Sequence, residues 1–263
     1  MSEQPKHPED ELAGTEQPFV THLMELRDRL VRAMIAVGVA ALILGFFPGP
    51  AALYDILAQP LVANLPKGAT LIATSVISPF MVPLKILMMA AFLMALPVVL
   101  YQLWAFIAPG LYAHEKKLVM PLVISSTVLF FIGVAFCYFF VFGQVFKFIQ
   151  SFAPKSITAA PDIEAYLDFV LSMFLAFGLT FEVPIAVVVL ARMGVVSVDK
   201  LKEFRGYFVV LAFVLAAVVT PPDVVSQLAL AIPMCILYEL GIWAAQVFIK
   251  HTQAPAEPFA DSE

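Results

Sequence analysis

Charged residues are scarce in this chain. Only 13% of its 263 residues are Asp, Glu, Lys or Arg, whereas 62% are hydrophobic and the mean hydropathy is +0.94. A water-soluble domain needs far more polar surface, so the composition excludes that class and predicts an integral membrane protein. The net charge of -5 then says little about partners, because each charge must first be placed relative to the bilayer.

Residues that carry chemistry are also few. The only two cysteines, Cys137 and Cys235, both fall inside apolar runs, where a thiol behaves as a small packed hydrophobe. They indicate neither a disulfide framework nor a metal site. No glycine-rich phosphate loop is present either. We therefore expect no metal, no cofactor, no nucleic-acid partner and no enzymatic activity.

Long apolar runs are what the sequence does have. A spanning helix needs about 20 mostly apolar residues, and six segments qualify or nearly do. They are approximately 30–47, 79–106, 118–146, 166–193, 206–219 and 225–249. The fifth, at about 14 residues, is short for a bilayer. The first run is not a signal peptide, because the long leader before it carries five acids ahead of Glu25.

The basic residues indicate an orientation. With six spans both termini lie on one side, and that side collects 11 of the 15 Lys and Arg residues. This bias places both termini in the cytoplasm. We expect residues 1–17 and 251–263 to be disordered cytoplasmic tails around a membrane domain at 18–250. In the first outer loop, the apolar stretch YDILAQPLV predicts a helix that lies on the outer face.

Interior prolines add bends to these spans. Pro97, Pro184 and Pro233 each remove a backbone hydrogen bond and kink their helix. The predicted fold is an all-α membrane protein of six helices in a bent, concave bundle.

Two cytoplasmic segments contain candidate binding carboxylates. In Thr21 to Arg32, Glu25 with Arg29 and Asp28 with Arg32 have helical pair spacing. In Phe106 to Pro121, Glu115 lies in a charged turn. In each segment the charges either fix the membrane topology or include a carboxylate that binds a cationic partner. A guanidinium group is a suitable partner, because it binds a carboxylate through two parallel hydrogen bonds.

Two further glutamates, Glu182 and Glu239, lie inside predicted spans. An ionisable group at mid-membrane costs at least about 2.5 kcal/mol, so it faces the bundle interior or water. Each is either a structural hydrogen bond to a neighbouring helix or a functional group. Taken alone, the pair also allows a proton-coupled small-molecule transporter, and the spans allow a scaffold without recognition of its own.

Several long motifs resemble the TatC family, the multispanning receptor subunits of twin-arginine protein translocases, over nearly all of Pro18 to Lys250. They are HLMELRDRL, LAQPL, TLIATSVISPF, YQLWAFIAPGLYAHEKKLVMPL, FGLTFEVP and VVTPPDVVSQLALAIPM. The resemblance implies an inner-membrane protein that binds the signal peptides of folded proteins on its cytoplasmic face. It also implies assembly with the single-span proteins TatA and TatB as a homo-oligomer within a TatBC complex, and transport driven by the proton-motive force.

The resemblance further implies roles for individual residues. The paired arginines of the signal peptide would meet Glu25 and Glu115, with Arg27, His22 and Phe106 in the same region. Five other positions would line the groove, contact a partner or have a structural role: Pro60, Asp162, Glu182, Asp223 and Gln227. We add Glu239 to this group. For Glu182 we expect a polar contact with a single-span partner or with water in the groove.

Overall fold

The structure is a computed structural model that describes residues 8–62, 71–107, 119–152, 161–220 and 223–250. Over these ranges it is helical apart from short connections, and one isolated β-bridge joins Ile72 to Asp162. The elements are α1 (Pro8–Phe46), α2 (Pro50–Val62), α3 (Ser78–Ile107), α4 (Val119–Phe136), the π-helix η3 (Cys137–Val141), α5 (Phe142–Phe152), α6 (Ile163–Phe181), α7 (Val183–Arg192), α8 (Val198–Glu203), α9 (Arg205–Val219) and α10 (Val224–Lys250). The predicted all-α class is confirmed.

Among the described residues, five helical segments are long and apolar enough to cross a membrane: Val20–Phe46, Ser78–Ile107, Val119–Phe148, Ile163–Arg192 and Val224–Val247. The fifth predicted span is α9, which has 15 residues and so extends for roughly 22 Å. A bilayer core is about 30 Å thick, so α9 is shorter than the membrane it would cross. The short fifth span predicted from the sequence is therefore present.

Two of the spans are interrupted. The third changes from α4 to η3 and then to α5. The fourth breaks into α6 and α7 at Glu182, two residues before Pro184. Because Pro184 has no N–H, the helix cannot form its regular bond there, and the ladder restarts when Ala186 N–H donates to the Glu182 carbonyl at 3.0 Å. The predicted interruption by Pro184 is therefore present as this break, whereas α3 and α10 each continue as one helix through Pro97 and Pro233.

Small residues set the closest helix contacts. Ala40 of α1 packs against Ala91 and Ala95 of α3, and small side chains allow membrane helices to approach closely. Between α4 and α6, a Cβ on Gly133 would lie 2.6 Å from the carbonyl oxygen of Phe177, so this crossing requires glycine. An aromatic core around Phe142 and Phe174 fills the space between η3, α5 and α6.

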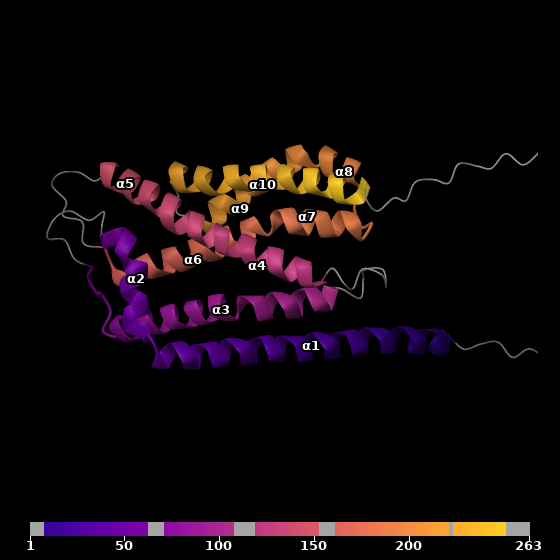
Figure 1. Ribbon diagram of the computed structural model, residues 1–263, viewed down its shortest axis with the longest axis horizontal. Helices are drawn as coiled ribbons and strands as arrows, with labels where there is room; N and C mark the ends of the chain where they lie inside the picture. The colour runs from indigo at the N-terminus through magenta and orange to yellow at the C-terminus, as the bar shows by residue number, and fades with distance from the viewer. Residues whose placement is uncertain (1–7, 63–70, 108–118, 153–160, 221–222, 251–263) are drawn as a thin grey trace, which may run out of the picture.

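The elements divide between two ends of the bundle. The start of α1, α8 and the end of α10 lie at one end, which we call the α8 end, and α2 lies at the other, the α2 end (Figure 1). Helix α2 contains the stretch YDILAQPLV, so the helix predicted there is confirmed. Helix α1 begins at Pro8, inside the segment 1–17 that we expected to lack regular structure. The predicted tail 251–263 lies outside the described residues.

Candidate functional site

Glu25 lies on α1 near the α8 end and is held by its own helix. Arg29 Nε donates to Glu25 Oε1 at 3.0 Å, which confirms the predicted pair one helical turn apart. The Glu25 side chain is 35% exposed, and His22 Nδ1 lies 4.0 Å from its other oxygen. A carboxylate accepts up to about four hydrogen bonds, so Glu25 keeps acceptor sites for a further donor.

An aromatic contact joins this part of α1 to the end of α3. The rings of His22 and Phe106 stack with their centroids 4.3 Å apart and their planes 18° from parallel. Three of the predicted site residues, His22, Glu25 and Phe106, therefore come together from two helices that are far apart in sequence. The resulting surface combines a part-exposed carboxylate with an aromatic wall, a combination suited to a guanidinium group.

Two other predicted members of this site do not join that surface. Arg27 is 71% exposed and pairs with its neighbour Asp28, whose Oδ1 accepts from Arg27 Nη2 at 2.8 Å. Asp28 thus pairs with Arg27, and our expected Asp28–Arg32 pair is wrong, because the adjacent guanidinium reaches the carboxylate first. Glu115 lies outside the described residues.

Glu182 is enclosed at the break between α6 and α7. Both of its carboxylate oxygens are buried, and within the described part of the chain neither has a hydrogen-bond partner. The carboxyl faces Ser126 of α4, whose hydroxyl accepts a hydrogen bond from Trp104 Nε1 at 2.9 Å. Sequence reasoning missed Trp104 and Ser126, although a serine inside an apolar span was the available signal.

At the α2 end, Asp162 joins the segment between α2 and α3 to the start of α6. It caps the start of α6 by accepting from Ala165 N–H at 3.1 Å, and it also accepts from the N–H and the hydroxyl of Thr74. The hydrogen bond from Ala165, followed by those from Thr74, lowers the pKa of the Asp162 carboxyl below its usual value. Of the roles that the resemblance allows for Asp162, these contacts correspond to the structural one.

A second polar cluster beside Asp162 was not predicted. Lys85 of α3 lies 3.2 Å from Glu164 and 2.8 Å from Asp168, both on α6. The buried Ser78 hydroxyl donates to Glu164 at 2.6 Å. The sequence did contain a signal for this cluster. Lys85 is the one basic residue in its predicted span, and Glu164 and Asp168 are four residues apart, so they share one helical face.

Pro60, another predicted site residue, lies in α2. Two tyrosine hydroxyls from other helical elements donate hydrogen bonds to backbone carbonyls of α2. Tyr138 donates to the carbonyl of Ile56 at 2.9 Å, and Tyr166 donates to the carbonyl of Leu57 at 3.0 Å. A proline four residues after Ile56 cannot supply the usual helical N–H to that carbonyl. Tyr138 supplies the missing donor.

The last predicted residues belong to α10. Asp223 caps its start by accepting from Ser226 N–H at 2.7 Å, and Gln227 donates to the carbonyl of Phe213 on α9 at 3.3 Å. Glu239 forms an ion pair with Arg205 at the first residue of α9. One of the two interpretations of Glu239 was a structural bond to a neighbouring helix. The structure shows such a bond, and its partner is Arg205 of α9.

Comparison with known proteins identifies the family. The family model described as "Sec-independent protein translocase protein (TatC)" matches residues 21–233. Proteins named "Sec-independent protein translocase protein TatC" are 50% identical over 232 residues in Haemophilus influenzae and 48% identical over 233 residues in Escherichia coli. These matches cover 88% and 89% of this chain and 90% of each relative.

A longer relative and a solved structure support the same family. The TatC of Halothiobacillus neapolitanus is 52% identical over 90% of this chain, and the match spans 64% of that longer protein. A crystal structure titled "Crystal Structure of Twin Arginine Translocase Receptor- TatC" superposes with a TM-score of 0.75 at 38% identity, covering 86% of this chain and 98% of its own. The chain belongs to the TatC family of multispanning membrane proteins of the Sec-independent protein translocase.

Proposed function

We propose that this chain is the signal-peptide receptor of a twin-arginine translocase, and that Glu25 receives one of the paired arginines. The observation that carries the proposal is the joint surface of Glu25, His22 and Phe106. A second arginine would meet Glu115, which follows Phe106 in sequence. The α8 end of the bundle would then face the cytoplasm.

The chemistry of the contact supports arginine over lysine. A guanidinium presents two parallel N–H groups to one carboxylate and stacks on an aromatic ring, and an ammonium does neither. A hydrogen bond to a charged group contributes about 1.5 to 3 kcal/mol where water is partly excluded. Two such sites would distinguish an arginine pair from a lysine pair by roughly 100-fold.

The competing ligand for Glu25 is internal. Arg29 already occupies one carboxylate oxygen, and its side chain is 21% exposed. An incoming arginine would bind the remaining acceptor sites or displace Arg29, whose pairing within one helix contributes only about 0.3 to 0.5 kcal/mol. Glu25 is therefore oriented by Arg29 and still able to accept a hydrogen bond from a ligand.

The test is photo-crosslinking of a twin-arginine signal peptide to the chain in membranes. Glu25→Gln should reduce the crosslink at least tenfold and slow export of a folded reporter to a similar degree. Asp28→Asn is the matched control, because Asp28 is a carboxylate on the same helix that bonds to Arg27. An equal loss in both variants, or no loss in Glu25→Gln, would contradict the proposal.

We further propose that Glu182 meets a polar side chain of a single-span partner, TatA or TatB. Both carboxylate oxygens of Glu182 are buried and have no hydrogen-bond partner among the described residues. This supports the proposal, because a buried polar atom costs free energy until it forms a hydrogen bond. Glu182→Gln should keep the chain inserted but reduce partner crosslinks near α7 several-fold. Unchanged crosslinks and export would leave Glu182 a purely internal residue.

A proton relay through both intramembrane glutamates gains no support from their contacts. Glu239 is neutralised by Arg205, whereas Glu182 faces Ser126 on a different helix. We expect no small-molecule flux in liposomes containing this chain alone. Transport energy would come from the proton-motive force through the assembled complex.

A further inference from the structure

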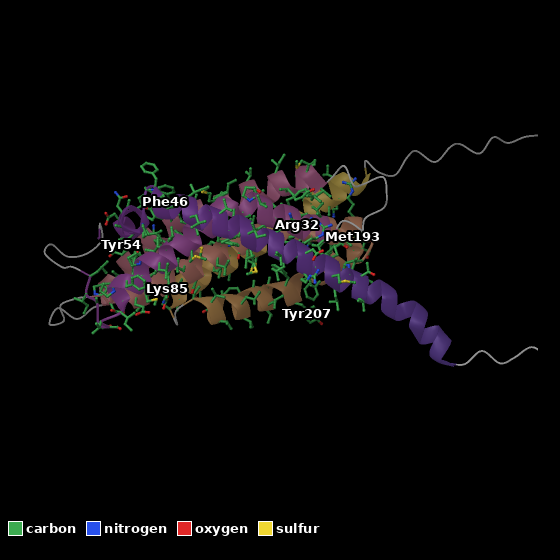
Figure 2. All side chains as sticks on the ribbon, turned by 90° about the horizontal axis from the view of Figure 1, so that it is seen from below. Arg32, Phe46, Tyr54, Lys85, Met193 and Tyr207 are labelled. Carbon is green, nitrogen blue, oxygen red and sulfur yellow. The ribbon has the colours of Figure 1, made fainter. Side chains whose placement is uncertain are left out.

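A groove of about 440 Å³ lies on the surface where the start of α9 meets the second half of α10. Its lining is Arg205, Ile236, Glu239, Leu240, Ile242, Trp243 and Gln246. None of these residues belongs to the surface around Glu25 or to the cluster around Glu182. Figure 2 shows Tyr207, which is on α9, at one edge of the bundle.

The ion pair in this groove offers both signs of charge side by side. Arg205 Nε lies 2.7 Å from Glu239 Oε1, and Arg205 Nη2 donates to Glu239 Oε2 at 2.8 Å. Both side chains are about half exposed, at 48% and 49%. The guanidinium has five N–H groups, so about three stay available, and each carboxylate oxygen keeps a lone pair.

The depth of this pair brings it within reach of lipid headgroups. Helix α9 is roughly 8 Å shorter than a bilayer core, and Arg205 is its first residue. A short span is accommodated by local thinning, which draws headgroups toward its end. Trp243 lines the groove and is 66% exposed, and its amphipathic ring favours the interface.

We propose that the groove binds one phospholipid whose headgroup carries both a phosphate and a primary ammonium, the phosphatidylethanolamine class. The phosphate accepts from Arg205, and the ammonium donates to Glu239. The upper part of an acyl chain lies along Ile236 and Leu240 and against the ring of Trp243. Charge complementarity selects this occupant, because a purely anionic headgroup meets the Glu239 carboxylate and a trimethylated ammonium has no N–H to donate.

Trp243 provides the measurement. The chain has two tryptophans, and the other, Trp104, is only 7% exposed. The full chain is reconstituted in phosphatidylcholine vesicles in which an equal fraction of lipid is dibrominated phosphatidylethanolamine, phosphatidylcholine or phosphatidylglycerol. Quenching is compared with that of Trp243→Phe, which reports the fixed background from Trp104.

Brominated phosphatidylethanolamine should quench Trp243 with roughly threefold higher apparent affinity than brominated phosphatidylcholine, because half-exposed charge contacts are individually weak. Arg205→Gln and Glu239→Gln should each remove this preference, and Glu239→Gln should raise the affinity for phosphatidylglycerol. The control Lys202→Gln should change nothing, since Lys202 pairs with Asp199 on α8, outside the groove.

Three results would overturn the proposal. Equal quenching by phosphatidylethanolamine and phosphatidylcholine would show that the headgroup is not recognised. A preference of the unaltered chain for phosphatidylglycerol would indicate a simple anion site on Arg205. No quenching by any brominated lipid would show that protein, such as a partner helix or a second copy, covers the groove. If Arg205→Gln does not insert, Glu239→Gln decides the outcome alone.

Discussion

The start of α1 and the α2 end of this bundle use their polar residues differently. Near the α8 end, Glu25 bonds to Arg29 and Asp28 bonds to Arg27, so both acids are satisfied within α1. At the α2 end, the polar bonds join separate elements: Asp162 reaches Thr74, and Lys85 of α3 reaches two acids of α6. Bonds within one helix can be exchanged for a ligand without moving other helices, whereas bonds between elements hold the frame.

This contrast assigns recognition to the surface around Glu25 and rigidity to the α2 end. Substitutions at the α2 end should then reduce stability, and substitutions around Glu25 should reduce binding while stability stays nearly constant. The four predictions that follow test this division, from the largest expected effect on stability to the smallest.

The largest effect should come from Ser78→Ala at the α2 end. Ser78 is 1% exposed, and its hydroxyl donates to Glu164 at 2.6 Å. Losing a buried hydrogen bond to a charged group should lower the free energy of unfolding by about 1.5 kcal/mol. Thermal unfolding of the purified protein measures it. Ser75→Ala, at an exposed position, should change stability by less than about 0.5 kcal/mol, and equal effects would refute the assignment.

Tyr138→Phe should reduce stability by about 1 kcal/mol, because it leaves the Ile56 carbonyl without its donor. A double-mutant cycle with Pro60→Ala isolates the cause. Alanine restores the helical N–H to that carbonyl, so Tyr138→Phe should have a smaller effect in the Pro60→Ala background. Strictly additive effects would show that Tyr138 does not substitute for the missing N–H.

Asp162 should make stability depend on acid conditions. Its pKa is lower in the folded chain than in the unfolded one, where it is about 3.9. The carboxylate therefore contributes its full stability above about pH 5 and loses it as the pH falls through the folded-state pKa. In thermal melts between about pH 6 and pH 3, Asp162→Asn should remove that part of the decline. An unchanged acid profile would argue against the tie to Thr74 and Ala165.

The smallest effect on stability should be that of Glu25→Gln. Because its bond to Arg29 stays within one helix and is partly exposed, unfolding should change by less than about 0.5 kcal/mol. The same variant should lose signal-peptide crosslinking, so binding and stability separate at this end. A destabilisation as large as that of Ser78→Ala would remove the distinction between the two ends.

Much of the fold could be predicted because the signals are local. Hydropathy and length located the spans, and the charge spacing in α1 predicted the Glu25–Arg29 pair. The break at Glu182 follows from Pro184, which lacks the N–H that a continuous helix needs. The Asp28 pairing was wrong because spacing on a helix allows several partners, and side-chain geometry chooses among them.

The candidate site could be predicted only in part. Family motifs named His22, Glu25 and Phe106, but no spacing rule places residue 106 against residue 22. The same holds for Ser126 beside Glu182, and for Lys85 between two acids of α6. These contacts depend on which helices pack together, so no single segment contains the information.

The sequence by itself determined that the chain lies in a membrane, the approximate bounds of its apolar spans, and the break before Pro184. Each of these depends on one segment and the bilayer: apolar length against membrane thickness, and the missing N–H of proline. Only the tertiary structure decided that His22, beside Glu25, stacks on Phe106, that Tyr138 donates to the Ile56 carbonyl of α2, and that Arg205 pairs with Glu239. Those results depend on helices packed against one another, because a side chain acquires its partner only when two surfaces meet.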